Sequence, residues 1–180
     1  TGLIWFYDDG TPEQEVVYRP RHFYTTDTEF AVVNQFAPDC VCVPKASLDE
    51  NKFNPSLSIN EDAELWARIT TNYPVISIEE STAKLRVHSG NTSALVEDAI
   101  TPMREVFELI IQNEKVRPKL SEAFIADRKR GFDELEIRSS EAKGTKLRTI
   151  RLIIKFLLKY PINPRNSSKL VSLLYLLPGG

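Results

Sequence analysis

An acidic pair and a histidine are the residues of this sequence whose types and spacing best suit chemistry. Glu61 and Asp62 follow Asn60 directly, and an asparagine in front of a helical pattern is typical of a helix N-cap. We therefore predict both carboxylates in the first helical turn, where unpaired N–H groups and the helix dipole favour negative charge. Asp62 is expected to be ionised at neutral pH and able to accept a proton from a substrate hydroxyl. The alternative is that the acidic pair only stabilises the helix end.

The elements that would position these residues are predicted from hydrophobic spacing. Short apolar or aromatic runs between turn residues predict strands at 3–7, 15–18, 40–44, 75–79 and 83–88. Apolar residues at helical spacing predict helices at 26–34 and 61–72. The first hundred residues are thus predicted to be mixed α and β, with Arg86 and His88 at the end of the last strand.

Beyond Asn91 the pattern is helical. Helices are predicted from Thr101 with Pro102 in the first turn, at 119–130 and at 144–160. The last of these is a basic amphipathic helix, with its apolar residues largely on one side (Leu147, Ile150, Ile153, Ile154, Leu157 and Leu158) and Arg148, Arg151, Lys155 and Lys159 interleaved. It either packs back on the protein core or lies on a membrane surface. The final apolar run, 170–177, is too short for the roughly 20 residues of a spanning helix.

Composition and charge narrow the class of protein. With 180 residues, 42% hydrophobic and 27% charged, the chain has the composition of a soluble globular protein the size of one ordinary domain. Cys40 and Cys42 are predicted to share one strand face as reduced core residues, and no leader is apparent, which favours a cytoplasmic location. Residues 1–100 carry a net charge of −9 and residues 101–180 a net charge of +7. The basic half suggests an anionic neighbour, and because it is aliphatic rather than aromatic we expect a membrane surface and no nucleic acid.

Four motifs in order resemble the second half of a family 2 glycosyltransferase. They are Phe53-Asn54-Pro55-Ser56-Leu57, Glu61-Asp62-x-x-Leu65-Trp66-x-Arg68-Ile69, Tyr73-Pro74-Val75 and Arg86-x-His88-x-x-Asn91-x-Ser93. The resemblance implies an α/β fold. Residues 1–93 would form the acceptor-side half of a GT-A fold, with a mixed sheet, and residues 94–180 a helical C-terminal extension.

The same resemblance implies an activity. It is metal-dependent, inverting transfer of a sugar from a nucleotide-diphosphate donor to a glycan or lipid-linked acceptor, with Asp62 as the base. His88 would contact the divalent cation, Mg²⁺ or Mn²⁺, or the diphosphate, and Arg86 would offset phosphate charge. Trp66 would form part of the acceptor wall, and Glu61 would orient or cap. The alternatives are that Trp66 lies in the core, that Arg68 pairs with Glu64 one turn away, and that His88 is a surface residue.

The sequence also departs from the family pattern. The Val-Ser-Val-Ile-Ile-Pro-like strand and the Asp-x-Asp motif that holds the metal are not found in it. Asp8 and Asp9 could bind a divalent ion, but with Gly10 they are more typical of a hairpin turn. We therefore expect this chain to be the C-terminal portion of a longer enzyme, inactive alone, cytoplasmic or peripheral on the inner face of the plasma membrane. The alternative function is a non-catalytic membrane-surface or interaction module.

Overall fold

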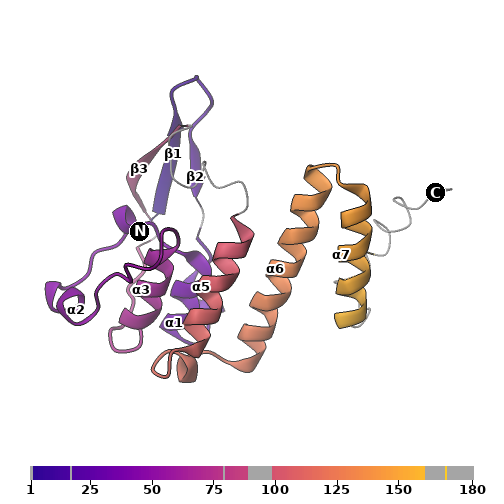
Figure 1. Cartoon of the computed structure of the whole chain (residues 1–180). Helices are drawn as coiled ribbons and strands as arrows, with labels where there is room; N and C mark the ends of the chain where they lie inside the picture. Colours follow the sequence, from indigo (N-terminus) through magenta and orange to yellow (C-terminus); the bar gives the residue numbers. More distant parts are fainter. Residues whose placement is uncertain (1, 17, 79, 89–98, 161–168, 170–180) are drawn as a thin grey trace. The chain divides into compact units, whose positions relative to one another are not determined.

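The computed structural model describes residues 2–16, 18–78, 80–88, 99–160 and 169. The chain forms two compact units, Thr1–Ile125 and Ala126–Gly180. The described part of the first unit is mixed α/β and that of the second is helical (Figure 1). The structure thus groups residues 99–125 with the α/β unit, and helix α5 (Ile100–Gln112) packs there against helix α3 (Glu61–Ile69).

The sheet of the first unit is small and mixed. Its three strands are β1 (Gly2–Tyr7), β2 (Gln14–Val16) and β3 (Ser81–Val87), in the order β2-β1-β3. β1 pairs with β2 in antiparallel fashion and with β3 in parallel. The predicted hairpin turn is confirmed: Gly10 adopts φ +83°, and the Asp9 carboxylate accepts the Thr11 N–H at 2.9 Å.

Two predicted strands, 40–44 and 75–79, do not join this sheet within the described residues. The first gives way to a short 3₁₀ helix, η2 (Pro38–Cys40), and then to helix α2 (Lys45–Glu50), which sequence analysis did not predict. Pro44 lacks an N–H for a ladder and instead stands in front of α2. The cysteines consequently differ, since Cys40 is buried and Cys42 is exposed, which corrects the prediction of two core residues.

Helices α1 (Asp27–Asn34) and α3 pack together to form the main core of the first unit. The buried cluster consists of Phe30, Ala31, Phe36, Leu65, Trp66 and Ile69. Both helices confirm the sequence prediction. α1 begins after Thr26, whose hydroxyl accepts the Glu29 N–H at 3.1 Å. α3 ends at Ile69, and the Thr70 hydroxyl then donates to the Trp66 carbonyl at 2.8 Å.

A buried carboxylate joins α1 to the segment that leads into helix α6 (Glu122–Ala142). Glu29 is 3% exposed. It accepts hydrogen bonds from the N–H and hydroxyl of Ser121 at 2.9 and 2.8 Å, and from the Thr25 N–H at 3.0 Å. The short helices η1 (Arg21–Phe23) and η3 (Arg117–Lys119) flank this connection in sequence.

The second unit is a helical hairpin. It contains α6 from Ala126 onward and helix α7 (Lys146–Lys159), joined by a turn in which Gly144 adopts φ +66°. Its core is formed by Ile137, Ile153 and Phe156. α6 is longer than the predicted 119–130. Among the described residues, no helix combines the length and apolar character needed to cross a bilayer.

Candidate functional site

Asp62 lies in the first turn of α3, as predicted. Asn60 occupies the N-cap position, but in a left-handed conformation with φ 56°, and its side chain makes no capping hydrogen bond. The helix start is instead stabilised by Asp62 itself, whose Oδ1 accepts the Ala63 N–H at 2.7 Å. One carboxylate oxygen is therefore fixed by the backbone at the beginning of α3.

The environment of Asp62 makes it more basic than an ordinary aspartate. Burial raises the pKa of its carboxyl group, and the neighbouring charge of Glu61 acts in the same direction. The hydrogen bond from Ala63 opposes these effects without cancelling them. The position of Asp62 at a helix end predicted only the effect that favours the ionised form, whereas the burial of this group acts against it.

Tyr18 is the residue near Asp62 that sequence analysis missed. Its ring packs edge-on against Phe36, with 4.7 Å between the ring centroids. Burial, the thiol of Cys40 and the charge of Asp62 together raise the pKa of Tyr18 to about 12. The phenol is therefore protonated at neutral pH and lies within the electrostatic reach of the Asp62 carboxylate. Its only signal in the sequence was an aromatic residue at the end of a predicted strand.

A cavity of about 570 Å³ opens beside Tyr18. Its lining includes polar and charged residues from the end of β2 and the segment that follows, among them Glu15, Arg19 and His22. Asp62 is not among its lining residues. The cavity is therefore next to the phenol rather than directly over the carboxylate.

Arg86 and His88 lie with Asp8 at the end of the sheet where the parallel strands β1 and β3 finish. The Arg86 Nε is 3.0 and 2.9 Å from the two carboxylate oxygens of Asp8. This hydrogen-bonded ion pair lowers the pKa of Asp8, and the charge of His88 lowers it further. No group of three or more His, Cys, Asp or Glu side chains suited to a metal ion occurs in the described ranges. Asn91 and Ser93, the rest of the Arg-x-His motif, lie outside those ranges.

The structure does not bring His88 to Asp62. Tyr18 interacts with both Cys40 and the charge of Asp62. The Cys40 Sγ is 3.8 Å from the Gly2 carbonyl oxygen, so this group of residues lies near the start of β1. His88 follows β3, whose last residue pairs with Tyr7 at the other end of β1. A six-residue strand measures about 17 Å at about 3.3 Å per residue. The hairpin end of β1 also projects away from α3 in Figure 1.

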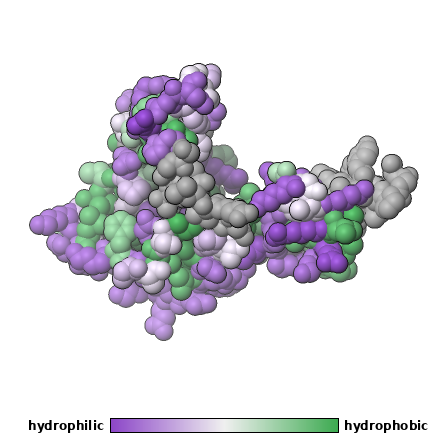
Figure 2. All heavy atoms as spheres, turned by 45° about the horizontal axis from the view of Figure 1, so that its top comes forward, coloured by the Kyte–Doolittle hydropathy of each residue, from purple (hydrophilic) through white to green (hydrophobic). Residues whose placement is uncertain are grey.

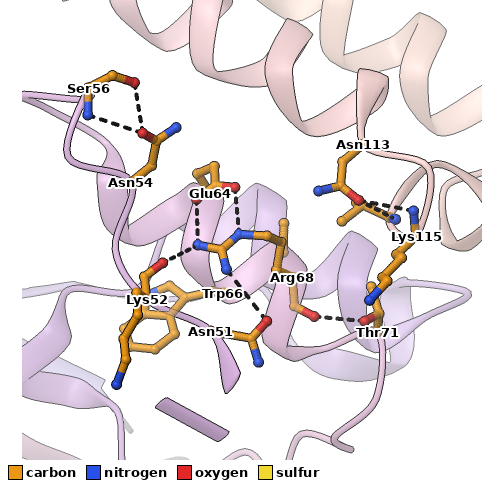
Figure 3. A network of polar contacts seen from close by, with 12 residues as sticks. Asn51, Lys52, Asn54, Ser56, Glu64, Trp66, Arg68, Thr71, Asn113 and Lys115 are labelled. Carbon is orange, nitrogen blue, oxygen red and sulfur yellow. Dashed lines mark hydrogen bonds and ion pairs between the residues drawn. The ribbon is translucent and has the colours of Figure 1, made fainter. Parts of the chain in front are cut away.

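Trp66 and Arg68 are structural residues in this arrangement (Figure 3). Trp66 is 6% exposed, and its indole N–H donates to the Phe36 carbonyl at 2.8 Å. Its burial agrees with the alternative that Trp66 lies in the core, and its part in an acceptor wall stays a prediction. Arg68 confirms the predicted pairing with Glu64, with 2.6 Å between Nε and Oε1, and also donates to the Lys52 carbonyl. Core packing thus fixes Trp66 in α3, and ion pairing fixes Arg68.

These observations define a mixed α/β chain with an acidic group of raised pKa at a helix start. A comparison of the chain with protein-family models, with curated proteins and with solved structures finds no match.

Proposed function

We propose that this chain is the acceptor-side part of an inverting glycosyltransferase with a GT-A fold, in which Asp62 is the base. The observation that carries the proposal is the partly buried carboxylate with a raised pKa in the first turn of α3. A general base is more effective when its pKa is closer to the working pH. The Glu61-Asp62-x-x-Leu65-Trp66-x-Arg68 context supports it through the family resemblance.

The geometry of Asp62 suits proton abstraction. The Ala63 N–H holds Oδ1, and no side chain among the described residues is seen to donate a hydrogen bond to Oδ2. In the proposed reaction, Oδ2 takes the proton of the acceptor hydroxyl while the acceptor oxygen forms a bond to the anomeric carbon of the donor. The bond from that carbon to the nucleotide diphosphate breaks, and the diphosphate leaves with the bonding electrons.

The described residues do not fit the divalent cation that the resemblance implies. The carboxylate of Asp8 lies within electrostatic reach of His88, and Arg86 engages both of its oxygens. A second cation at this position would be repelled by the guanidinium group. The proposal therefore places the nucleotide sugar, its diphosphate and Mg²⁺ or Mn²⁺ in a donor-binding half of a longer enzyme. In this proposal Asp62 and His88 do not act together on the same substrate group.

The test joins this chain to such a donor-binding half and measures the release of nucleoside diphosphate from nucleotide sugars. Asp62→Asn keeps the shape of the side chain and the acceptor for the Ala63 N–H but removes the base. We expect kcat to fall by about 10² to 10⁴-fold. Glu61→Gln is the control, with a much smaller change. Asp62→Asn that retains most of the activity would contradict the proposal.

A further inference from the structure

Helix α7 has two apolar faces rather than the single one that its sequence suggested. Ile153 and Phe156 are buried in the core of the helical hairpin. Leu147, Ile154 and Leu158 are 75%, 44% and 83% exposed. At about 100° per residue these three lie within about 40° of one another around the helix axis. We call this row of exposed side chains the outer stripe.

Positive charge accompanies the outer stripe. Helix α7 contains five Lys or Arg residues and no Asp or Glu. Arg148 pairs with Glu136, and Lys159 pairs with Asp133. Among the described residues, no ion pair engages Lys146, Arg151 or Lys155. Figure 2 shows hydrophobic and hydrophilic side chains adjacent to one another on the surface of this hairpin.

We propose that the outer stripe docks on an anionic lipid bilayer, with α7 parallel to the membrane plane. Leu147, Ile154 and Leu158 enter the boundary between headgroups and acyl chains, and Arg151 and Lys155 contact lipid phosphates. This inference does not depend on the proposed glycosyl transfer, since it concerns the second unit alone.

Charge and side-chain type favour a bilayer over other partners. A second copy docked through the same face would bring two sets of unneutralised cations together. A nucleic acid would offer phosphates to the cations but would leave the aliphatic stripe without apolar contacts, and the stripe has no aromatic ring for base stacking. A bilayer with anionic headgroups satisfies both the charge and the apolar surface.

The experiment is co-sedimentation of the full chain with sucrose-loaded vesicles. One set contains phosphatidylcholine alone and the other also contains phosphatidylglycerol. We expect binding to the anionic vesicles that weakens as salt is added. Near an anionic surface, about 1 kcal/mol per cation corresponds to about fivefold in partition. Arg151→Gln/Lys155→Gln should therefore reduce the partition coefficient about 25-fold. Leu147→Ser/Leu158→Ser should also reduce it strongly.

A matched control has the same change of net charge in the first unit. Lys45 and Lys115 are both exposed there, and Lys45→Gln/Lys115→Gln should bind vesicles as the unmodified chain does. Far-UV circular dichroism confirms that each variant keeps its helices. No binding to anionic vesicles, or unchanged binding by Arg151→Gln/Lys155→Gln, overturns the proposal. So does a dimer, detected by light scattering, that Leu147→Ser/Leu158→Ser dissociates while vesicles leave the chain unbound.

Discussion

Asp62 and Glu29 are carboxylates in the first turns of two packed helices, yet their pKa values shift in opposite directions. Burial raises the pKa of both groups. At Glu29, the hydrogen bonds from Ser121, Thr25 and Thr26 outweigh it, and the net pKa is lowered. Asp62 has only the backbone bonds of its own turn, so its pKa remains raised. The balance between burial and hydrogen-bond donors therefore decides the sign of each shift.

The raised pKa of Asp62 predicts that Asp62→Asn stabilises the protein at pH 7. The folded state holds the Asp62 proton more tightly than the unfolded chain, so the ionised form weakens the fold once the pH exceeds the folded-state pKa. The stabilisation should disappear as the pH falls below the ordinary value of 3.8. Urea unfolding at several pH values measures it. A variant less stable than the unmodified chain at pH 7 would show that the charge is stabilising.

The lowered pKa of Glu29 predicts the opposite dependence on pH. Glu29→Gln removes the charge-assisted acceptor and should lower the free energy of unfolding by about 2 kcal/mol at pH 7. The ionised form contributes its stability above the ordinary value of 4.5 and loses it as the pH falls through the lower folded-state value. The gap between variant and unmodified chain should therefore narrow in acid. Glu105→Gln, at an exposed position of α5, should change the stability little at either pH.

The features of the site that depend on neighbouring residues in the sequence could be predicted. Those that depend on how distant strands pair could not. The position of Asp62 followed from helix-start chemistry, which is local. The proximity of Tyr18 to Asp62 and the separation of His88 from it depend on how β1 pairs with β3, which local spacing does not encode. Trp66 has the same ambiguity, because an aromatic residue at helical spacing fits either a core or an acceptor wall until its burial is known.

At the scale of elements, alternation and turn chemistry predicted the three strands of the sheet. The hairpin of β1 and β2 has Asp-Gly chemistry in its turn, and β3 alternates between half-buried and exposed residues. The runs 40–44 and 75–79 are equally apolar, yet neither joins the described sheet. A strand requires a hydrogen-bonding neighbour as well as a suitable sequence, and that neighbour is not specified by the run itself.

Substitutions at two glycines test the backbone conformation of the elements in which they lie. Gly10 adopts φ +83° in the hairpin turn, so Gly10→Ala should destabilise the first unit by about 1 kcal/mol. Gly131 lies inside α6 with no heavy atom within 4 Å of an added Cβ. Gly131→Ala should therefore stabilise α6 by about 0.5 to 1 kcal/mol. Urea unfolding followed by circular dichroism measures both, and effects of the same sign would contradict these assignments.

At the scale of the whole molecule, the chain has two compact units with separate cores. Both tryptophans, Trp5 and Trp66, belong to the first unit. Tryptophan fluorescence therefore reports the unfolding of the first unit, whereas far-UV circular dichroism reports the helices of both. The two signals together distinguish separate from concerted unfolding.

A substitution at Ile153, which is fully buried, tests whether the two units unfold separately. Ile153→Ala should destabilise the helical hairpin by about 2 to 4 kcal/mol. The circular dichroism transition should acquire an earlier component, while the fluorescence midpoint stays unchanged. Ile154→Ala, at the partly exposed neighbouring position, is the control and should have a much smaller effect. Equal shifts in both signals would show that the two units unfold as one.

The opposite burial of Cys40 and Cys42 has a consequence for experiments on the intact protein. A thiol-specific reagent should alkylate Cys42 quickly, because this residue is exposed. Cys40 is buried against the start of β1, and burial raises the pKa of its thiol. It should react only when this part of the core transiently opens. The rate of this slow second modification, followed by mass spectrometry without denaturant, then measures how often the core opens at the start of β1.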